Sequence, residues 1–451
     1  MATPEALIKY YDCLKDSFNK IQDKDNKTAL INAALRPKIC EEFAKSEQVL
    51  NSYLNYIQVF SLIYSDKFSS ICTNIIAPLL KEDDSTAYDE MSPHVSEKLT
   101  RVHQTIQTIV ESRNELGEDF VHSVVKVFPS MSTDDTDDNR RFLSYLKNCL
   151  RVCMYLSGEN LVILLSRIIE RVNPLDQSSD EEEKERLNQA TYRAYELIYK
   201  FIEMIDRKQL SRFVEALIAS FTREFLSYPP AGSQLNYLLL YACSLDEEFS
   251  ECLIGSLWKT FTDSKRPFEE RRASVNFASS FIARANYVGL NKTFEYLETA
   301  SAWCIEYLDD YQESETHDRI VAEDVGTFYA LTQSIFYLIT QRYRDIYEEE
   351  TIAKLMQLNL SRILECPLRP LENCDLQTST RFQEVATLCR IDCSVRNQLL
   401  PIAKRRKSDR EPKGLNICNA PFDETCNSLP ERIKPLYRNY FNHRNFTIYR
   451  E

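Results

Sequence analysis

The chain has 451 residues, a net charge of −13 and only 7 glycines. A chain with this acidic surplus is a poor stand-alone binder of nucleic-acid phosphates, which Lys and Arg must neutralise. Its scarce, widely separated glycines exclude the Gly-rich loops that bind nucleotide phosphates, and they favour helices over hairpins. We therefore expect an all-α fold.

Residues 1–173 are predicted to form an N-terminal helical-repeat half. Apolar residues recur three or four positions apart, which indicates helices with one buried face. The clearest run is Leu99, Val102, Ile106, Ile109 and Val110. A polar segment at 130–139 is expected to be a solvated loop, followed by apolar helices at 142–156 and 159–172.

An acidic, serine-containing loop or linker is predicted at 174–187, with helices resuming at Leu187. Ser178 and Ser179 precede a run of Asp and Glu, so each has an acidic residue three positions on. That pattern suits an acidophilic kinase, and both serines are candidate phosphorylation sites. The alternative is an unmodified solvated linker.

Residues 188–366 are predicted to form the C-terminal helical-repeat half. Helices are expected at 234–243 and 247–262, with a capping box between Ser244 and Glu247. The stretch 268–311 indicates two helices joined at Gly289, a residue suited to the left-handed conformation after a helix end. Two such pairs of antiparallel helices, each some thirty to forty-five residues long, predict a HEAT-like helical-repeat solenoid.

The remaining segment, 367–451, is punctuated by proline and is basic at its end. Residues 401–451 carry eleven Lys or Arg against six Asp or Glu. We expect this segment to pack on the end of the solenoid. Its compact basic run is a candidate nuclear-import signal, with a flexible surface loop as the alternative. The run consists of Lys404, Arg405, Arg406 and Lys407.

Residues typical of catalysis do not form a pattern in this chain. The 5 histidines are scattered, and the cysteine pairs Cys149/Cys153 and Cys389/Cys393 lack a nearby histidine that would complete a zinc site. No catalytic, cofactor or metal site is therefore expected, and the chain is not expected to be an enzyme. The start lacks a signal-peptide core and no apolar run reaches bilayer length, so an intracellular protein with reduced thiols is predicted.

Several motifs, in the same order along about 115–445, resemble the family of RNA polymerase I-specific transcription initiation factors, the TIF-IA family. The family's S-F-L-A-R-A sequence is matched here with Ile282 in place of Leu. Upstream, Leu257, Trp258 and Lys259 match the Leu-Trp-Lys helix that ends a similar run in the family. Glu424 and Tyr440 depart from the family pattern, and the acidic loop is short. The matching signature residues are Trp258, Ser280, Phe281, Ala283, Arg284, Ala285, Pro421, Phe422 and Asp423.

The resemblance implies a non-catalytic, nuclear and nucleolar adaptor. It would bind RNA polymerase I near its stalk, bridge it to promoter-bound core factor at ribosomal RNA genes, and form a homodimer as an inactive form. Membrane binding is not expected, and direct DNA contact is at most secondary. In the family a serine-bearing surface of the N-terminal half faces the polymerase; Ser123, Ser130 and Ser132 are the candidates here. The alternative is another acidic helical-repeat scaffold, such as a transport receptor or a phosphatase-type scaffold.

Overall fold

The structure is a computed structural model that describes residues 3–17, 20, 46–80, 97–131, 136–173, 180–227, 234–313, 322–389, 391, 422 and 429–438. Within these ranges the secondary structure is helical, and no strand occurs apart from one isolated bridge between Ala285 and Tyr437. The predicted all-α, helical-repeat fold is confirmed. The residues cluster into two compact units, Met1–Ser220 and Phe221–Glu451.

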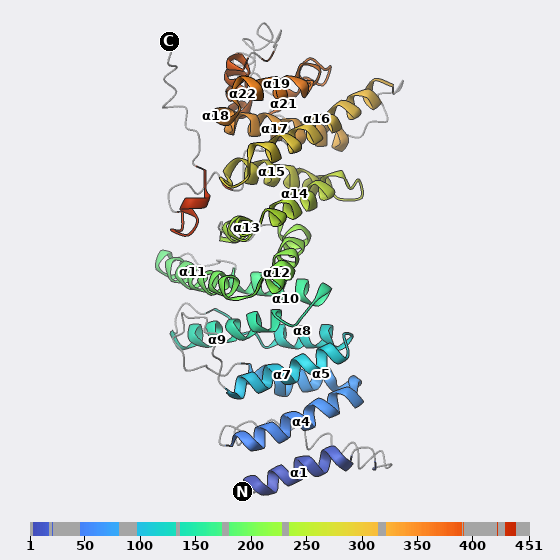
Figure 1. Ribbon diagram of the computed structural model, residues 1–451, viewed down its shortest axis with the longest axis vertical. Coiled ribbons are helices and arrows are strands. Elements are labelled where there is room, and N and C mark those ends of the chain that lie inside the picture. Colours follow the sequence, from blue (N-terminus) through green and yellow to red (C-terminus); the bar gives the residue numbers. More distant parts are fainter. Residues whose placement is uncertain are drawn as a thin grey trace. The chain divides into compact units, whose positions relative to one another are not determined.

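Unit 1 is a stack of helices in which many pack on a helix one or two positions away in the chain, as α10 does on both α8 and α12 (Figure 1). All five residues of the apolar run at 99–110 are buried, so α7 turns the face predicted from their spacing toward the interior. The helices are α1 (Pro4–Ser17), α4 (Glu47–Ile63), α5 (Phe68–Ile71), α6 (Ala77–Leu79), α7 (Glu97–Ser112), α8 (Leu116–Lys126), α9 (Thr136–Cys153), α10 (Gly158–Val172), α11 (Glu181–Met204) and α12 (Arg207–Ser220).

Two helices of unit 1 begin inside segments that were expected to be loops. Helix α11 begins at Glu181 rather than near Leu187, because the Asp180 side chain accepts a hydrogen bond from the Glu182 amide at 3.0 Å. Acidic residues in the first turn add to this start, since the helix dipole favours negative charge there. Helix α9 likewise begins at Thr136, within the predicted loop 130–139. The four-part domain division remains a proposal.

Unit 2 is built around α15, which packs on both α14 and α17. The second half of α15 is buried on every side, so this helix lies in the core of the unit. The helices of unit 2 are α13 (Gln234–Ser244), α14 (Glu247–Thr262), α15 (Phe268–Arg284), α16 (Leu290–Glu313), α17 (Ala322–Gln341), α18 (Tyr343–Ile346), α19 (Glu349–Gln357), α20 (Leu360–Leu364), α21 (Pro370–Asn373), α22 (Leu376–Leu388) and the short 3-10 turn η5 (Lys434–Leu436).

Helix α14 has the predicted bounds, but two predictions about helix termini in unit 2 are wrong: the Ser244 cap of α14 and the left-handed conformation of Gly289. The cap of α14 is Asp246, whose carboxylate accepts from the Glu248 amide, whereas the Ser244 hydroxyl donates back to the Tyr241 carbonyl. Gly289 does not adopt the left-handed conformation; among the described glycines Gly158 alone has a positive φ. The chain leaves α15 at Ala285 in an extended conformation instead.

That extended exit is held by the far end of the chain. The amide of Asn286 donates to the Leu436 carbonyl at 3.0 Å, and the amide of Arg438 donates to the Arg284 carbonyl at 2.7 Å. Residues 429–438 therefore lie beside α13 and the carboxyl end of α15. This position differs from the predicted one at the end of the stack.

Candidate protein-protein interfaces

The described residues offer little for catalysis. No group of three or more His, Cys, Asp or Glu among them is placed to hold a metal ion. Burial raises the pKa of the Cys149 and Cys243 thiols, which makes them inert as nucleophiles. Within the same ranges, no helix is both long and apolar enough to cross a membrane. The candidate sites are therefore surfaces.

Ser123, a predicted polymerase-interface residue, is buried in α8. Its hydroxyl donates to the carbonyls of Asp119 at 2.8 Å and Ser69 at 3.2 Å. The side chain thus joins α8 to α5 in the core of unit 1, because Ser69 belongs to α5. Neither a kinase nor a partner protein reaches this hydroxyl in the folded chain, so the structure argues against Ser123 as an interface residue.

Ser130 is exposed just after α8. The turn that carries it is held firmly, because Phe128 is buried against the rings of Phe142 and Tyr145 at 5.4 and 4.9 Å. The Tyr145 hydroxyl also donates to the Val124 carbonyl at 2.8 Å. Ser130 is therefore the one described candidate of the three on a surface that a partner can meet. Ser132 lies outside the described residues.

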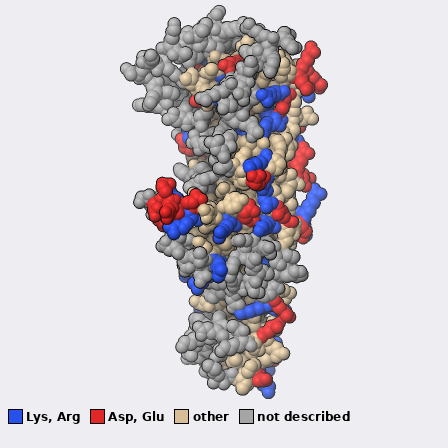
Figure 2. All heavy atoms as spheres, turned by 90° about the vertical axis from the view of Figure 1, so that its left-hand side faces the viewer, with Lys and Arg blue, Asp and Glu red and all other residues tan. Residues whose placement is uncertain are grey.

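The amino-terminal turns of α11 form an acidic surface of unit 1. Glu181, Glu182 and Glu185 are all exposed there, and Figure 2 shows acidic side chains in red on a projecting part at mid-height. The candidate phosphorylation sites Ser178 and Ser179 lie outside the described residues, although the chain places them directly before this surface. Lys404 to Lys407, the nuclear-import candidate, also lie outside.

The signature residues divide into buried and half-buried positions. The Ser280–Ala285 stretch is buried throughout, and Arg284 donates to the Tyr337 hydroxyl at 3.2 Å, so this motif builds the core. Phe422 is buried against Phe277 with ring centroids 5.4 Å apart. Trp258 is only half-buried and lines the surface between α14 and α16. Pro421 and Asp423 lie outside the described residues.

A charged cluster that the sequence did not predict closes the carboxyl end of α15. The Arg342 guanidinium is buried and donates to the carbonyls of Ile282 and Val288, both at 3.1 Å. Its Nε also donates to Asp345 at 2.7 Å, and Arg438 pairs with the same carboxylate. Two segments distant in sequence are thus joined through Asp345.

Unit 1 contains a second unpredicted cluster, around His103. Its Nδ1 lies 3.1 Å from the Tyr155 hydroxyl and its Nε2 lies 3.4 Å from Asn148 Oδ1. That oxygen also accepts from Arg151, so Nε2 carries the proton and Nδ1 accepts from Tyr155. Burial, with Arg151 as a second cause, lowers the pKa of His103 to about 4, against the raising effect of the Asn148 hydrogen bond. The imidazole is therefore neutral at pH 7.

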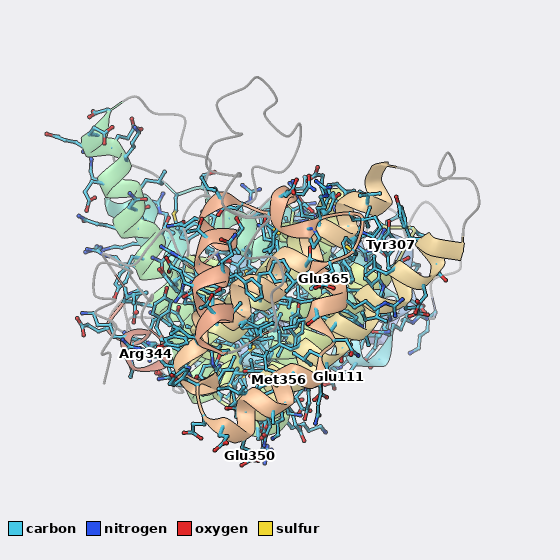
Figure 3. The ribbon with its side chains drawn as sticks, turned by 90° about the horizontal axis from the view of Figure 1, so that it is seen from above. Glu111, Tyr307, Arg344, Glu350, Met356 and Glu365 are labelled. Atoms are coloured by element: carbon cyan, nitrogen blue, oxygen red, sulfur yellow. The ribbon has the colours of Figure 1, made fainter. Side chains whose placement is uncertain are left out.

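The last helices of unit 2 expose three large apolar side chains. Tyr347, Met356 and Leu376 are 53%, 55% and 44% exposed. Figure 3 shows Met356 and Glu350 of α19 toward the lower margin of the view, with Arg344 of α18 at the left. Single exposed apolar side chains are common on protein surfaces, so these three do not by themselves mark an interface.

The chain is similar to proteins of RNA polymerase I transcription. A family model described as RNA polymerase I specific transcription initiation factor RRN3 matches residues 1–195 and 190–393. The RNA polymerase I-specific transcription initiation factor RRN3 of Mus musculus is 23% identical over 450 residues, covering 84% of this chain and 67% of the mouse protein.

Two shorter matches cover about a third of each relative. The factor tif-1A of Caenorhabditis elegans is 24% identical over 218 residues, which are 46% of this chain and 31% of that protein. The factor rrn3 of Schizosaccharomyces pombe is 26% identical over 205 residues, 42% of this chain and 34% of that protein. The crystal structure of RNA polymerase I transcription initiation factor Rrn3 has the same fold, with a TM-score of 0.66 and 16% identity across 97% of this chain and 90% of that chain.

Proposed function

Because the chain belongs to the family of RNA polymerase I-specific transcription initiation factors, we propose that it binds RNA polymerase I near its stalk and bridges the enzyme to promoter-bound core factor. The observation that carries the proposal is the family match, which extends through unit 1 and far into unit 2. The ribosomal RNA genes are the proposed place of action, and the nucleus and nucleolus the proposed location.

A non-catalytic adaptor role agrees with the surfaces of the two units. Stacked helices present side chains from one helix after another, which suits contact with large partners. The acidic start of α11 and the net charge of −13 favour basic protein surfaces over nucleic acid. Direct DNA contact is therefore proposed to be secondary at most.

The polymerase-facing surface is proposed to include Ser130, with Ser132 beside it in the chain. A phosphate would add about two negative charges at that surface and oppose contact with acidic groups of a partner. Ser178 and Ser179 are proposed as further phosphorylation sites, where added negative charge would be favourable just before the amino terminus of α11. Lys404 to Lys407 are proposed to serve nuclear import. A homodimer as an inactive form remains part of the proposal.

The deciding experiment is a pull-down of the tagged chain from its own cells, with the recovered proteins identified. Recovery of the largest polymerase I subunits and the stalk would support the function. Loss of the polymerase with Ser130→Glu, but not with Ser130→Ala, would support the surface. Ser123 is left unchanged, because a glutamate at that buried position would disturb the core of unit 1.

Two other results are informative. If polymerase I is recovered equally with both Ser130 variants, the function stands and the interface lies elsewhere. If the recovered proteins are transport factors or a phosphatase and polymerase I is absent, the proposed function is wrong and the alternative of a general helical-repeat scaffold is favoured.

A further inference from the structure

Unit 2 has an open groove between α14 and α16. Its volume is about 310 Å³, and its apolar lining comes from Ile254, Gly255 and Trp258 on α14 and from Tyr296 and Thr299 on α16. Gly255 leaves the helix backbone bare, since nothing lies within 4 Å of the place where a Cβ would be. The missing side chain opens room for a side chain from elsewhere.

The aromatic wall of this groove is rigid. Trp258 contacts the Phe261 ring at 5.2 Å and the Tyr296 ring edge-on at 6.2 Å. Behind them, Trp303 packs against Phe261 at 5.0 Å and stacks on Tyr307 at 5.4 Å. A preformed wall loses little conformational freedom on binding, which favours affinity.

One polar atom of the groove wall is unsatisfied. The Tyr296 side chain is only 4% exposed, and its hydroxyl has no hydrogen-bond partner among the described residues. Buried hydroxyls almost always have such a partner. Because this hydroxyl is buried, the groove offers an occupant the apolar part of the Tyr296 ring rather than its polar atom.

The rim of the groove is negative. Lys292 Nζ lies 2.5 Å from a Glu251 oxygen and 3.0 Å from a Glu295 oxygen, so one ammonium is shared between two carboxylates. The side chains of both glutamates are about half exposed or more, at 49% and 61%. This rim attracts a further cation and repels phosphates and acidic peptides.

We propose that this groove binds a short peptide segment of a protein partner in which a large apolar side chain stands next to Lys or Arg. The apolar side chain enters between Gly255 and Tyr296, and the cation reaches the carboxylates of Glu251 and Glu295. The apolar lining and the negative rim together favour such a peptide over nucleic acid and over acidic peptides. The groove lies in unit 2, whereas the proposed polymerase surface around Ser130 lies in unit 1.

The test is a selection of random displayed peptides on the full chain, with the variant Gly255→Leu as counter-selection. The leucine fills the groove, and because the Cβ site is open the variant should fold with an equal or higher melting temperature. Peptides enriched on the unchanged chain are expected to carry an apolar residue beside Lys or Arg. Their binding, measured by fluorescence anisotropy, should weaken by roughly tenfold or more in Gly255→Leu.

Two further variants sharpen the result. Gly255→Ala adds too little volume to block the groove and should retain binding. The double change Glu251→Lys with Glu295→Lys should shift the selection toward peptides rich in Asp and Glu. The proposal would be overturned by a selection that enriches nothing, by enriched peptides that lack a cation, or by peptides that bind Gly255→Leu as well as the unchanged chain. None of these outcomes depends on whether polymerase I is recovered in the pull-down.

Discussion

Each unit buries a polar side chain in its helical core, and the two side chains differ in charge. In unit 1 a neutral imidazole, His103, is held between Tyr155 and Asn148. In unit 2 a guanidinium, Arg342, is held by two carbonyls and Asp345. An arginine stays charged at any working pH, whereas a histidine changes charge between pH 4 and 7. The difference implies that acid weakens unit 1 through His103, whereas the Arg342 guanidinium of unit 2 keeps its charge.

The clusters also differ in how far along the chain their members lie. The His103 cluster joins α7 to the carboxyl end of α9, within about fifty residues. The Arg342 cluster is completed by Arg438, 93 residues after Asp345. The charged cluster of unit 2 therefore spans more of the chain than the His103 cluster of unit 1 does. Both tryptophans, Trp258 and Trp303, lie in unit 2, so tryptophan fluorescence follows that unit alone.

The largest expected effect comes from breaking the charged cluster. Arg342→Ala leaves the carbonyls of Ile282 and Val288 without their donor and Asp345 without its buried partner. We expect unit 2 to lose about 4 kcal/mol of unfolding free energy. Urea unfolding followed by tryptophan fluorescence measures it. The matched control is Arg344→Ala at an exposed site two residues away, where the loss should stay under about 0.5 kcal/mol. Equal losses in the two variants would contradict the assigned role.

The second-largest expected effect is a loss of unfolding free energy by unit 1 in acid. The folded pKa of His103 is about 4, below the ordinary 6.5, so between these values the unfolded chain binds a proton that the folded chain rejects. The contribution is full above pH 6.5 and is lost as the pH falls toward 4, by about 3 kcal/mol in total. Circular dichroism should show a transition at lower urea than tryptophan fluorescence does as the pH drops. His103→Gln should remove most of this slope; an unchanged slope would assign it to other groups.

A matched pair of hydroxyl deletions tests whether the units respond alike to the same chemical change. Tyr145 donates to the Val124 carbonyl in unit 1, and Tyr437 donates to the Phe422 carbonyl in unit 2, both at 2.8 Å. Replacing either by Phe should cost about 1 to 1.5 kcal/mol. Thermal unfolding should register Tyr145→Phe mainly by circular dichroism and Tyr437→Phe also by tryptophan fluorescence. If Tyr437→Phe had no effect, the contact of the distant segment would not contribute to stability.

The smallest expected effect is a gain in stability, and it distinguishes the open groove from the packed core. Gly255→Ala adds a methyl group in open space on a helix, so unit 2 should gain up to about 1 kcal/mol. Gly326→Ala in α17 provides the contrast, because the new Cβ would lie 2.9 Å from the Phe268 ring. This variant should therefore destabilise unit 2. Melting temperatures of the two variants measure both. A destabilising Gly255→Ala would mean that the groove is packed rather than open.

Much of the fold was predictable because it depends on local patterns. The apolar spacing at 99–110 identified a buried helix face, and the bounds of α14 follow from its sequence. The signal for Ser123 was also present: it stands three positions after Phe120, on the face that α8 buries. Weighing that spacing would have excluded Ser123 as a surface residue.

Other features depend on contacts that no local pattern contains. Arg342 and Arg438 are ordinary surface-type residues in sequence, and their roles appear only once the segment 429–438 lies against α15. Trp258 and Phe281 both belong to the family signature, yet one lines an open groove and the other is fully buried. Helical spacing alone indicates an apolar position, not whether the space beside it is filled.

The long return of residues 429–438 also has a consequence during synthesis. A ribosome completes α15 well over a hundred residues before it reaches Tyr437. Until then the carbonyl of Arg284 and the amide of Asn286 lack the hydrogen bonds that they make with Arg438 and Leu436. Until Phe422 arrives, Phe277 lacks that ring contact. In a nascent or prematurely terminated chain Phe277 would keep its contact with Phe221 but lack the one with Phe422. Unit 2 is therefore completed only after translation through Arg438.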